Sequence, residues 1–366
     1  MRNNSFGDNF TITTWGESHG KALGVVIDGV PAGLNLTEDD IQSFLDRRRP
    51  GKSKYSTPRN EGDKAIILSG TFDDTTTGCP VSVMIENENQ KSRDYSNIAN
   101  VYRPGHADFT YEEKFGTRDY RGGGRSSGRE TASRVIGGAV ASKILNELGI
   151  EINCYTKSIG KYAITDSKDI HLDEMDNPLN MPNDMVAVQA MDYIDECMKN
   201  NDSVGGVVEC VIRNTPVGVG EPAFNKLDAN LAKAMLSIGA VKGFEMGDGF
   251  GVARARGSDN NDEMSYDRGV LFHSNHSGGV LGGISTGQDI VFRVAIKPTP
   301  SIGRTQHTID TYNDEIDINI TGRHDPVIVP RAVVVVESMA AITLLDLLMD
   351  NMTSRMDYLK KIYNGS

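Results

Sequence analysis

The feature that most constrains the fold of this sequence is a set of short runs rich in β-branched residues, each bounded by turn residues. Runs of this kind are typical of β-strands. They lie at residues 22–29, 64–70, 81–87, 204–212, 289–297 and 331–336. Because glycine turns and helical segments separate them, we expect strands and helices to be mixed along the whole chain.

Fewer segments carry the signals of a helix. Thr37 followed by Asp40 has the spacing of a capping box, with Asp in the position usually held by Glu, which predicts a helix that starts after Thr37. Residues 229–238 and 338–352 suit two further helices. The acidic and polar region 157–202 shows little regular pattern at its start, and we expect it to be a surface excursion or a peripheral subdomain.

A short echo links the two halves of the sequence. Gly24-Val25-Val26 runs on to Pro31-Ala32-Gly33, and Gly206-Val207-Val208 runs on to Pro216-Val217-Gly218. The echo suggests an internal duplication of an α+β half, with halves at about 1–150 and 204–350. We expect both halves to belong to one domain that spans residues 1–366, a length that suits one large domain or two closely joined halves.

Composition narrows the class of protein. With 38% hydrophobic and 24% charged residues, the chain has ample apolar material for a large core. No stretch approaches the roughly 20 apolar residues of a membrane span and the first residues lack the apolar block of a signal peptide, so we expect a cytoplasmic protein with no membrane partner. The formal net charge of -12 argues against a general nucleic-acid binder, which needs a basic surface. The cysteines lack zinc-ligand spacing, and we expect reduced, buried thiols and no metal site.

A glycine loop at residues 120–128 is the longest informative motif. Ser127 and Glu130 have the spacing of a capping box, and apolar residues then recur at helical spacing from Ala132 to Ile144. The first amides of such a helix point back into the loop, where absent side chains allow an anion to approach the backbone and the helix dipole adds a partial positive charge. The loop is therefore suited to hold an anion.

Three other interpretations of this loop compete with anion binding: a P-loop, a dinucleotide-binding motif and a purely structural turn. Gly123 and Gly128 have the spacing of a nucleotide-binding P-loop, but Arg129 and Glu130 replace the Lys and the Ser or Thr that this motif requires. No G-x-G-x-x-G motif follows a strand, so a dinucleotide-binding fold has no support. The glycines could also serve only to form a tight turn before a capped helix.

A second basic segment, residues 47–54, contains three consecutive arginines followed by Lys52 and Lys54. Alone, such a run is more often a solvated surface patch. In an acidic protein, however, arginines beside glycine turns in two separate segments indicate a pocket for a ligand with several negative charges. The reason is that guanidinium groups bind carboxylates and phosphates in bidentate fashion.

Two histidines and one carboxylate stand in turn contexts that favour proton chemistry. His19 follows an apparent strand, and His106 lies in Arg103-Pro104-Gly105-His106-Ala107-Asp108. Histidines on turns with Arg and Asp close in sequence favour acid chemistry near neutral pH over a purely structural role. Asp325, in Gly322-Arg323-His324-Asp325-Pro326, is expected to stay ionised beside an arginine and to be available as a proton acceptor.

These motifs together resemble those of chorismate synthases over nearly the whole chain. The segments that carry the resemblance, in the order found in that family, are Gly16-Glu17-Ser18-His19-Gly20, Asp46 to Gly51, Arg103 to Asp108, Asp119 to Thr131 and Gly322 to Pro326. The resemblance implies an α+β fold in which helices are sandwiched between antiparallel β-sheets, assembled as a homotetramer. It also implies a lyase that needs reduced FMN and converts 5-enolpyruvylshikimate 3-phosphate to chorismate, the last step of the shikimate pathway in aromatic amino acid biosynthesis.

The resemblance also assigns roles to individual residues. The positions that match the flavin-contacting set are Arg125, Ser126, Ser127, Gly239, Ala240, Gly282, Lys297, Pro298, Thr299, Pro300, Ser301 and Arg323. Arg48 and Lys54 match positions assigned to an NADPH contact, although the family usually has Arg at the second of them, which leaves a bidentate contact there in doubt. Arg49, Arg129 and Arg134 are expected to bind the anionic substrate.

The implied reaction is an anti 1,4-elimination of phosphate with no net redox change. His19 would protonate the departing phosphate, His106 would protonate or stabilise the anionic reduced flavin, and Asp325 would act through flavin N5 in removing the carbon-6 proton. Whether the protein reduces its own FMN with NADPH is open, since the sequence has no recognisable reductase module. Two alternatives from other classes are an NAD(P)H:flavin oxidoreductase and a non-catalytic polyanion-binding protein.

Overall fold

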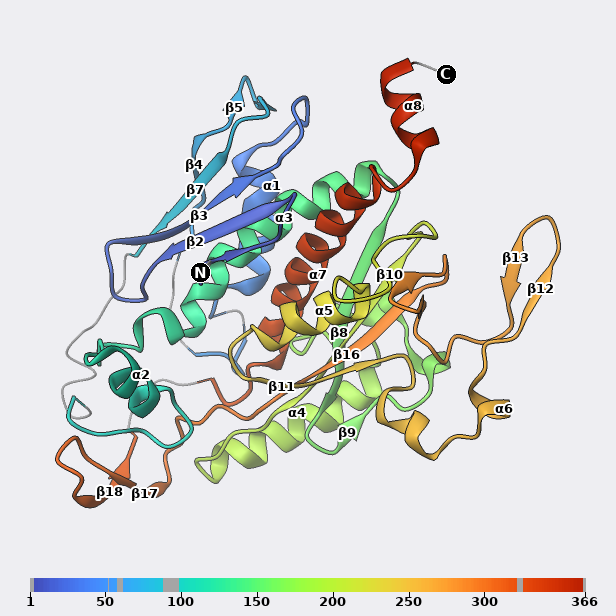
Figure 1. Cartoon of the computed structure of the whole chain (residues 1–366). Coiled ribbons are helices and arrows are strands. Elements are labelled where there is room, and N and C mark those ends of the chain that lie inside the picture. The colour runs from blue at the N-terminus through green and yellow to red at the C-terminus, as the bar shows by residue number, and fades with distance from the viewer. Residues whose placement is uncertain (1–2, 52, 58–61, 88–98, 321–324, 365–366) are drawn as a thin grey trace.

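Two five-stranded antiparallel sheets enclose a layer of helices in the computed structural model, which describes residues 3–51, 53–57, 62–87, 99–320 and 325–364. The first sheet has the strand order β1-β2-β3-β7-β4, and the second has the order β11-β16-β10-β8-β9. Figure 1 shows the helices α1, α3, α5 and α7 between the two sheets. This arrangement confirms the predicted α+β fold with helices sandwiched between antiparallel sheets.

The bounds of the elements follow the chain. The first sheet consists of β1 (Ser5–Phe6), β2 (Thr11–Gly16), β3 (Ala22–Asp28), β4 (Ile66–Ser69) and β7 (Val81–Glu86). The second sheet consists of β8 (Glu151–Ile159), β9 (Tyr162–Ala163), β10 (Gly206–Arg213), β11 (Val241–Met246) and β16 (Ile290–Ile296). The α-helices are α1 (Glu38–Arg48), α2 (Asp108–Phe115), α3 (Thr131–Glu147), α4 (Asp184–Lys199), α5 (Leu227–Leu236), α6 (Gly257–Asn260), α7 (Val329–Asn351) and α8 (Met356–Asn364). Two-stranded pairs are β5 (Thr71–Phe72) with β6 (Thr75–Thr76), β12 (Met264–Tyr266) with β13 (Val270–Phe272), β14 (Val280–Leu281) with β15 (Ile284–Ser285), and β17 (Thr305–Ile309) with β18 (Glu315–Asn319).

Most predicted strands are confirmed, and one is wrong. The runs at 22–29, 64–70, 81–87, 204–212 and 289–297 contain β3, β4, β7, β10 and β16. The run at 331–336 instead forms the first turns of α7, in which Pro330 lies at the start of the helix. Its valines have high β-propensity, but tertiary burial between the sheets overrides this preference, and proline suits a first helical turn.

The helix starts were predicted with mixed success. The capping box of α1 is present, since Thr37 Oγ1 accepts a hydrogen bond from the Asp40 amide and Asp40 Oδ2 accepts one from the Thr37 amide. The predicted capping box of Ser127 and Glu130 is wrong, because Ser127 Oγ accepts a bond from the Arg129 amide and the Glu130 carboxylate binds Arg134. A short 3₁₀ turn, Gly128–Glu130, precedes α3 instead.

The two sheets share one topology. In the first sheet, β2 and β3 are followed by α1, then by β4 and β7, and then by α3, with the spatial order β2-β3-β7-β4. In the second, β8 and β10 are followed by α5, then by β11 and β16, and then by α7, with the spatial order β8-β10-β16-β11. This repeated order supports the internal duplication that we propose from the sequence echo.

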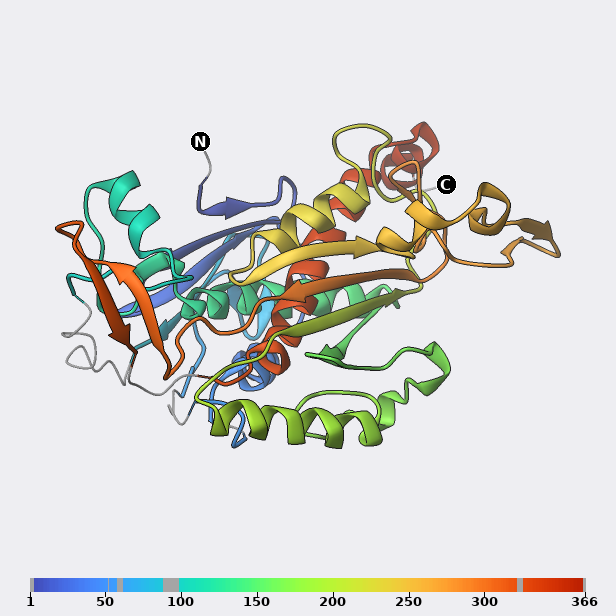
Figure 2. The same cartoon turned by 90° about the horizontal axis from the view of Figure 1, so that it is seen from below.

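The region 157–202 contains more regular structure than its sequence suggested. It holds the end of β8, the short strand β9 and the helix α4, which the sequence analysis did not predict. Asn183 caps α4, because its side chain accepts a hydrogen bond from the Val186 amide. Figure 2 shows α4 below the second sheet, outside the central helix layer.

The core helix α7 lies against both α3 and the second sheet. It is long and apolar enough to cross a membrane, so the prediction that no stretch approaches a membrane span is wrong for this segment. However, 78% of its most apolar window is buried inside the fold, as expected of the central helix of a globular core. A Cβ on Gly138 of α3 would lie 2.1 Å from Ser338 Cβ of α7, so the two helices meet at a glycine.

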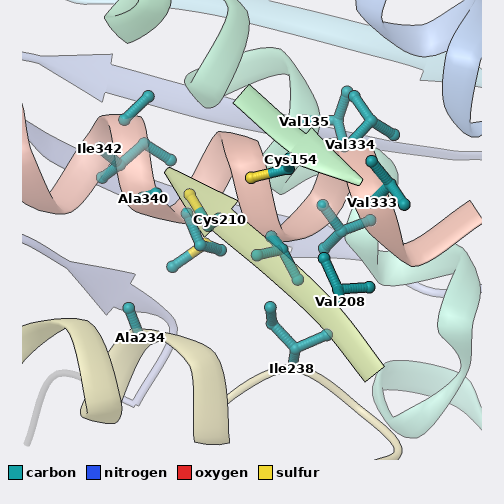
Figure 3. Close-up of a cluster of buried hydrophobic side chains, with 14 of the residues drawn as sticks. Val135, Cys154, Val208, Cys210, Ala234, Ile238, Val333, Val334, Ala340 and Ile342 are labelled. Carbon is teal, nitrogen blue, oxygen red and sulfur yellow. The ribbon is translucent and has the colours of Figure 1, made fainter. Parts of the chain in front are cut away.

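The cysteines are free thiols. Cys154 and Cys210 are register partners on β8 and β10 and are buried among the valines of α7, as Figure 3 shows. Burial raises the pKa of the Cys154 thiol well above its ordinary value, so this residue is a packing residue and a poor nucleophile. Cys79 is exposed, and the prediction of burial is wrong for it.

Candidate active site

Loops that carry most of the predicted site residues gather at one end of the sandwich, where α2 and the β17–β18 pair lie in Figure 1. Three of these segments are the loop after β2, the end of α1, and the glycine loop before α3. Hydrogen bonds and ion pairs join these segments. The site is therefore built from both halves of the chain at the ends of the central helices.

His19 lies directly against the glycine loop. Its Nδ1 is 3.1 Å from Ser18 Oγ, which in turn donates to the Gly122 carbonyl at 3.3 Å. Gly122 has φ +109°, and a Cβ at this position would lie 2.4 Å from His19 Cε1. Only glycine fits here, since any side chain would be strained and would strike the imidazole.

Gly122→Ala is therefore expected to displace the His19 imidazole and to lower turnover by about tenfold or more. The matched control is Gly116→Ala, because Gly116 also has a positive φ of +69° but a Cβ there would meet nothing within 4 Å. Gly122→Ala should lose more stability in thermal unfolding than Gly116→Ala, because it adds the clash with His19, so turnover is compared at a temperature where both variants are folded. Equal turnover in the two variants would show that the contact with His19 is unimportant.

Arg48 and Arg129 meet at a buried carboxylate that the sequence analysis did not identify. Asp63 Oδ2 lies 3.0 Å from Arg48 Nη2, and Asp63 Oδ1 pairs with Arg129 Nη1. Asn87 was also missed: it accepts a bond from Arg129 Nε at 3.1 Å and donates to the carbonyls of Glu17 at 3.0 Å and Gly20 at 2.9 Å. These contacts tie the second basic segment, the glycine loop and the His19 loop into one network.

Asp325 joins the same network through a different arginine from the one expected. Its Oδ2 accepts a bond from Arg331 Nη1 at 2.6 Å, and its Oδ1 accepts one from the Thr57 amide at 2.7 Å. Arg331 Nε donates to the Arg48 carbonyl at 3.1 Å. Arg323, the arginine expected beside Asp325, lies outside the described residues.

His106 is held in one orientation by hydrogen bonds to both of its ring nitrogens. Nδ1 lies 3.1 Å from the Pro104 carbonyl, which can only accept, so Nδ1 carries the proton. Nε2 lies 2.9 Å from Ser301 Oγ and accepts from that hydroxyl. Burial, with the nearby Arg103 cation, lowers the pKa of His106 to about 4, so this imidazole is neutral at neutral pH.

The lowered pKa of His106 predicts an acid sensitivity of the fold. Because the unfolded chain takes up a proton near the ordinary value of 6.5 and the folded chain only near 4, the free energy of unfolding should fall as pH drops through this window. The contribution lost is about 3 kcal/mol. His106→Gln should show a flatter pH dependence of unfolding by urea between these values. The same slope in both proteins would contradict the assignment.

The segment 297–301 packs against the His106 turn. Lys297 Nζ donates to the Gly105 carbonyl at 2.6 Å, and the Lys297 amide donates to the Ala240 carbonyl at 2.9 Å. Thr299 Oγ1 is buried and has no hydrogen-bond partner among the residues that the structure describes. A buried hydroxyl without a partner, beside a lysine and a serine, fits a polar group of a bound cofactor such as FMN.

In the glycine loop, the predicted flavin-contacting residues are partly engaged with the protein. Arg125 donates to Thr14 Oγ1 at 2.6 Å and to the Gly16 carbonyl at 3.2 Å, and so is held against β2. Ser126 Oγ donates to the Gly123 carbonyl at 2.7 Å. The loop also borders a cavity of about 620 Å³. The residues that line this cavity are Glu17, Tyr111, Phe115, Thr117, Arg118, Asp119, Tyr120, Arg121, Gly124 and Arg125.

Several predicted site residues are held elsewhere. Lys54 is exposed and pairs with Asp195 of α4 at 2.8 Å, whereas its expected partner at the NADPH contact, Arg48, is buried. Arg49 is half-exposed and lies 3.5 Å from Asp46.

Four further predicted residues lie near α5. Arg134 donates to Ser237 Oγ at 2.6 Å and anchors the end of α5. Gly282 lies in the turn beside the start of α5, because the Leu227 amide donates to the carbonyl of the next residue, Gly283. Gly239 and Ala240 instead follow the end of this helix. The length of α5, about 15 Å, therefore separates Gly282 from Gly239 and Ala240, and so from Lys297, whose amide bonds Ala240. Pro298 and Pro300 belong to the segment described above, and Lys52 lies outside the described residues.

Comparisons with known proteins match almost the whole chain to chorismate synthases. The family model described as Chorismate synthase matches residues 10–349. The chain is 58% identical over 369 residues to the chorismate synthase of Lachnoclostridium phytofermentans, with 99% of this chain and 100% of that protein covered. It is 59% identical over 365 residues to the chorismate synthase of Agathobacter rectalis, with 99% of each covered. A solved structure described as the crystal structure of chorismate synthase matches with a TM-score of 0.76 at 34% identity, covering 98% of each chain.

Proposed function

The chain belongs to the chorismate synthase family and is a lyase of that kind, and from this premise we propose that it eliminates phosphate from 5-enolpyruvylshikimate 3-phosphate with reduced FMN bound. The observation that supports this proposal best is the network that joins the His19 loop, Arg129, Arg48 and Asp325. A cation pair, an imidazole and a carboxylate at one end of the fold suit the elimination of an anionic leaving group.

The substrate carries two carboxylates and a phosphate, so its recognition requires positive charge. We propose that Arg48 and Arg129 supply this charge, together with the amides of the glycine loop at the start of α3. Guanidinium groups held in a site with little water bind such anions strongly, because few water molecules compete for them. Arg49 and Arg134 are less suited to this role, since their side chains bind Asp46 and Ser237.

Two groups are suited to move the protons of the reaction. We propose that His19 donates a proton to the departing phosphate, because its ring lies against the anion-binding glycine loop. We propose that Asp325 takes up the proton that leaves the substrate ring, because its carboxylate is held at the end of the same network. General acid and base groups of this kind typically contribute about 10² to 10⁴-fold to a rate.

The residues proposed to hold FMN are those of the segment 297–301, the Gly239–Ala240 turn and the glycine loop. Reduced FMN, when bound, would supply electron density transiently and recover it, so that the reaction has no net redox change. His106 would lie beside this FMN site as a neutral imidazole, with its orientation fixed by the hydrogen bond to Ser301. We further propose that the protein is cytoplasmic and assembles as a homotetramer. An assay with oxidised FMN and NADPH tests whether NADPH reduces the flavin on this protein.

An anaerobic assay tests the proposed function. The full chain is mixed with 5-enolpyruvylshikimate 3-phosphate and dithionite-reduced FMN, and release of phosphate and formation of chorismate are expected. Absence of both products would refute the proposal. A second arm supplies oxidised FMN and NADPH instead, and product formation there would show that the protein reduces its own cofactor. Steady NADPH consumption without the substrate would favour a flavin oxidoreductase.

A further inference from the structure

One carboxylate, Asp63, holds both arginines of the proposed substrate site. Each of its oxygens faces one guanidinium group, with Oδ2 at 3.0 Å from Arg48 Nη2 and Oδ1 paired with Arg129 Nη1. The side chains of Asp63, Arg48 and Arg129 are 0%, 3% and 10% exposed. Because the two oxygens belong to one planar group, the carboxylate fixes the position of each guanidinium relative to the other.

The backbone at Asp63 is adapted to this position. Asp63 has φ +45°, in the left-handed region that aspartate and asparagine adopt more readily than most residues. Burial opposes ionisation of Asp63, but the Arg48 and Arg129 cations outweigh it and hold the pKa of the carboxyl below its ordinary value. The group is therefore an anion throughout the physiological range.

The arginines that Asp63 holds lie under the glycine loop and beside the His19 loop. Arg48 Nη1 lies 3.4 Å from the Gly128 carbonyl and 3.3 Å from Thr131 Oγ1, at the start of α3. Arg129 Nε donates to Asn87, which binds the backbone of the His19 loop. A shift of either guanidinium group would thus reach the elements that surround the proposed substrate.

We propose that Asp63 is a positioning residue that fixes Arg48 and Arg129 as one anion-binding pair for the phosphorylated substrate. This inference rests on the function proposed above. One carboxylate neutralises only one of the two guanidinium charges, so the pair keeps a net positive charge for the ligand. Asp63 itself is buried beneath the arginines and acts through them.

Asp63→Asn is the variant that tests the inference. Asparagine keeps the size and tolerates the left-handed backbone, but its amide NH₂ would face one of the two guanidinium donors and release it. We expect the dissociation constant for 5-enolpyruvylshikimate 3-phosphate, measured by calorimetry without reduced flavin, to rise by about tenfold or more. The turnover at saturating substrate should change less than KM. An unchanged dissociation constant would overturn the inference.

Glu337→Gln separates positioning from a loss of stability. Glu337 is a buried carboxylate of α7 that pairs with Arg47, the residue before Arg48 in α1. Its removal breaks the ion pair of a buried carboxylate with a more exposed arginine, and should lower the melting temperature without a change in substrate affinity. If Glu337→Gln weakens binding as much as Asp63→Asn does, Asp63 has only a structural role and the inference fails.

A second pair of variants keeps the inference testable if Asp63→Asn does not fold. Arg48→Met removes the buried cation, so the double variant Arg48→Met with Asp63→Asn leaves no unpaired charge at residue 48. Relative to Arg48→Met, the double variant gains one net positive charge, which by itself favours an anion. We nevertheless expect it to bind substrate about tenfold more weakly, because Arg129 is no longer fixed by Asp63. Equal affinities would overturn the inference. Failure of the unmodified chain to release phosphate would instead refute the proposed function, and the inference with it.

Discussion

Asp325→Asn is expected to lower turnover by about 10²-fold or more while the protein stays folded. Asparagine has the size of aspartate and can still accept the hydrogen bond that the Thr57 amide donates at 2.7 Å. It cannot take up a proton, and it loses the ion pair with Arg331. The rate of phosphate release, measured anaerobically with chemically reduced FMN at saturating substrate, checks this prediction.

The control for Asp325 is Asp346→Asn. Asp346 lies in α7 and accepts bonds from the backbone amides of Asp8, Asn9 and Phe10, so it resembles Asp325 in capping a backbone segment but belongs to no proposed catalytic contact. Its replacement should change stability and leave turnover nearly unchanged. A near-normal rate in Asp325→Asn, with the protein folded, would remove Asp325 from the mechanism.

His19→Ala is expected to have an effect of similar size, about 10²-fold or more on turnover. The imidazole lies against Gly122 of the glycine loop, so its loss removes the proposed proton donor to the leaving phosphate. Substrate affinity should change much less, because Arg48 and Arg129 remain in place. Single-turnover measurements of phosphate release, together with calorimetric binding, separate these two quantities.

An exposed histidine serves as the control for His19. His307 pairs with Asp317 at 3.0 Å on the β17–β18 hairpin and makes no contact with the glycine loop in the described structure. His307→Ala should keep normal turnover. If His19→Ala weakens substrate binding as strongly as it slows phosphate release, His19 acts in binding and the proposed acid role is wrong.

The sequence predicted those parts of the fold that depend on local signals. The capping box at Thr37 was found because both of its hydrogen bonds lie within one turn of helix. The start of α7 was missed because four consecutive valines favour a strand locally, and only burial between two sheets makes them helical. Helix α4 carries local signals, since Asn183 caps it and Ala187, Ala190 and Ile194 recur at helical spacing, but it lies in a region whose polar start shows no regular pattern.

Only those residues of the candidate site that stand in local sequence motifs were predicted. Arg48, Arg129, His19 and Asp325 stand in motifs that a reader of the sequence can find. Asp63 stands in no such motif, since an acidic residue after a glycine resembles any surface turn. Its importance arises from contacts with Arg48 and Arg129, which are 15 and 66 residues away in the chain. Contacts at such separations exist only after the chain has folded.

The glycine at position 138 has a consequence for natural variation in this protein. Because a Cβ at position 138 would overlap the Ser338 side chain of α7, this residue sets how closely α3 and α7 can approach. Arg129 precedes the start of α3 and Asp325 precedes the start of α7, so each helix carries one part of the site. A larger residue at 138, roughly 13 Å along the helix from Arg129, would move these two parts relative to each other. Such a substitution would look like a catalytic defect in a genetic screen although it alters no group that meets the substrate.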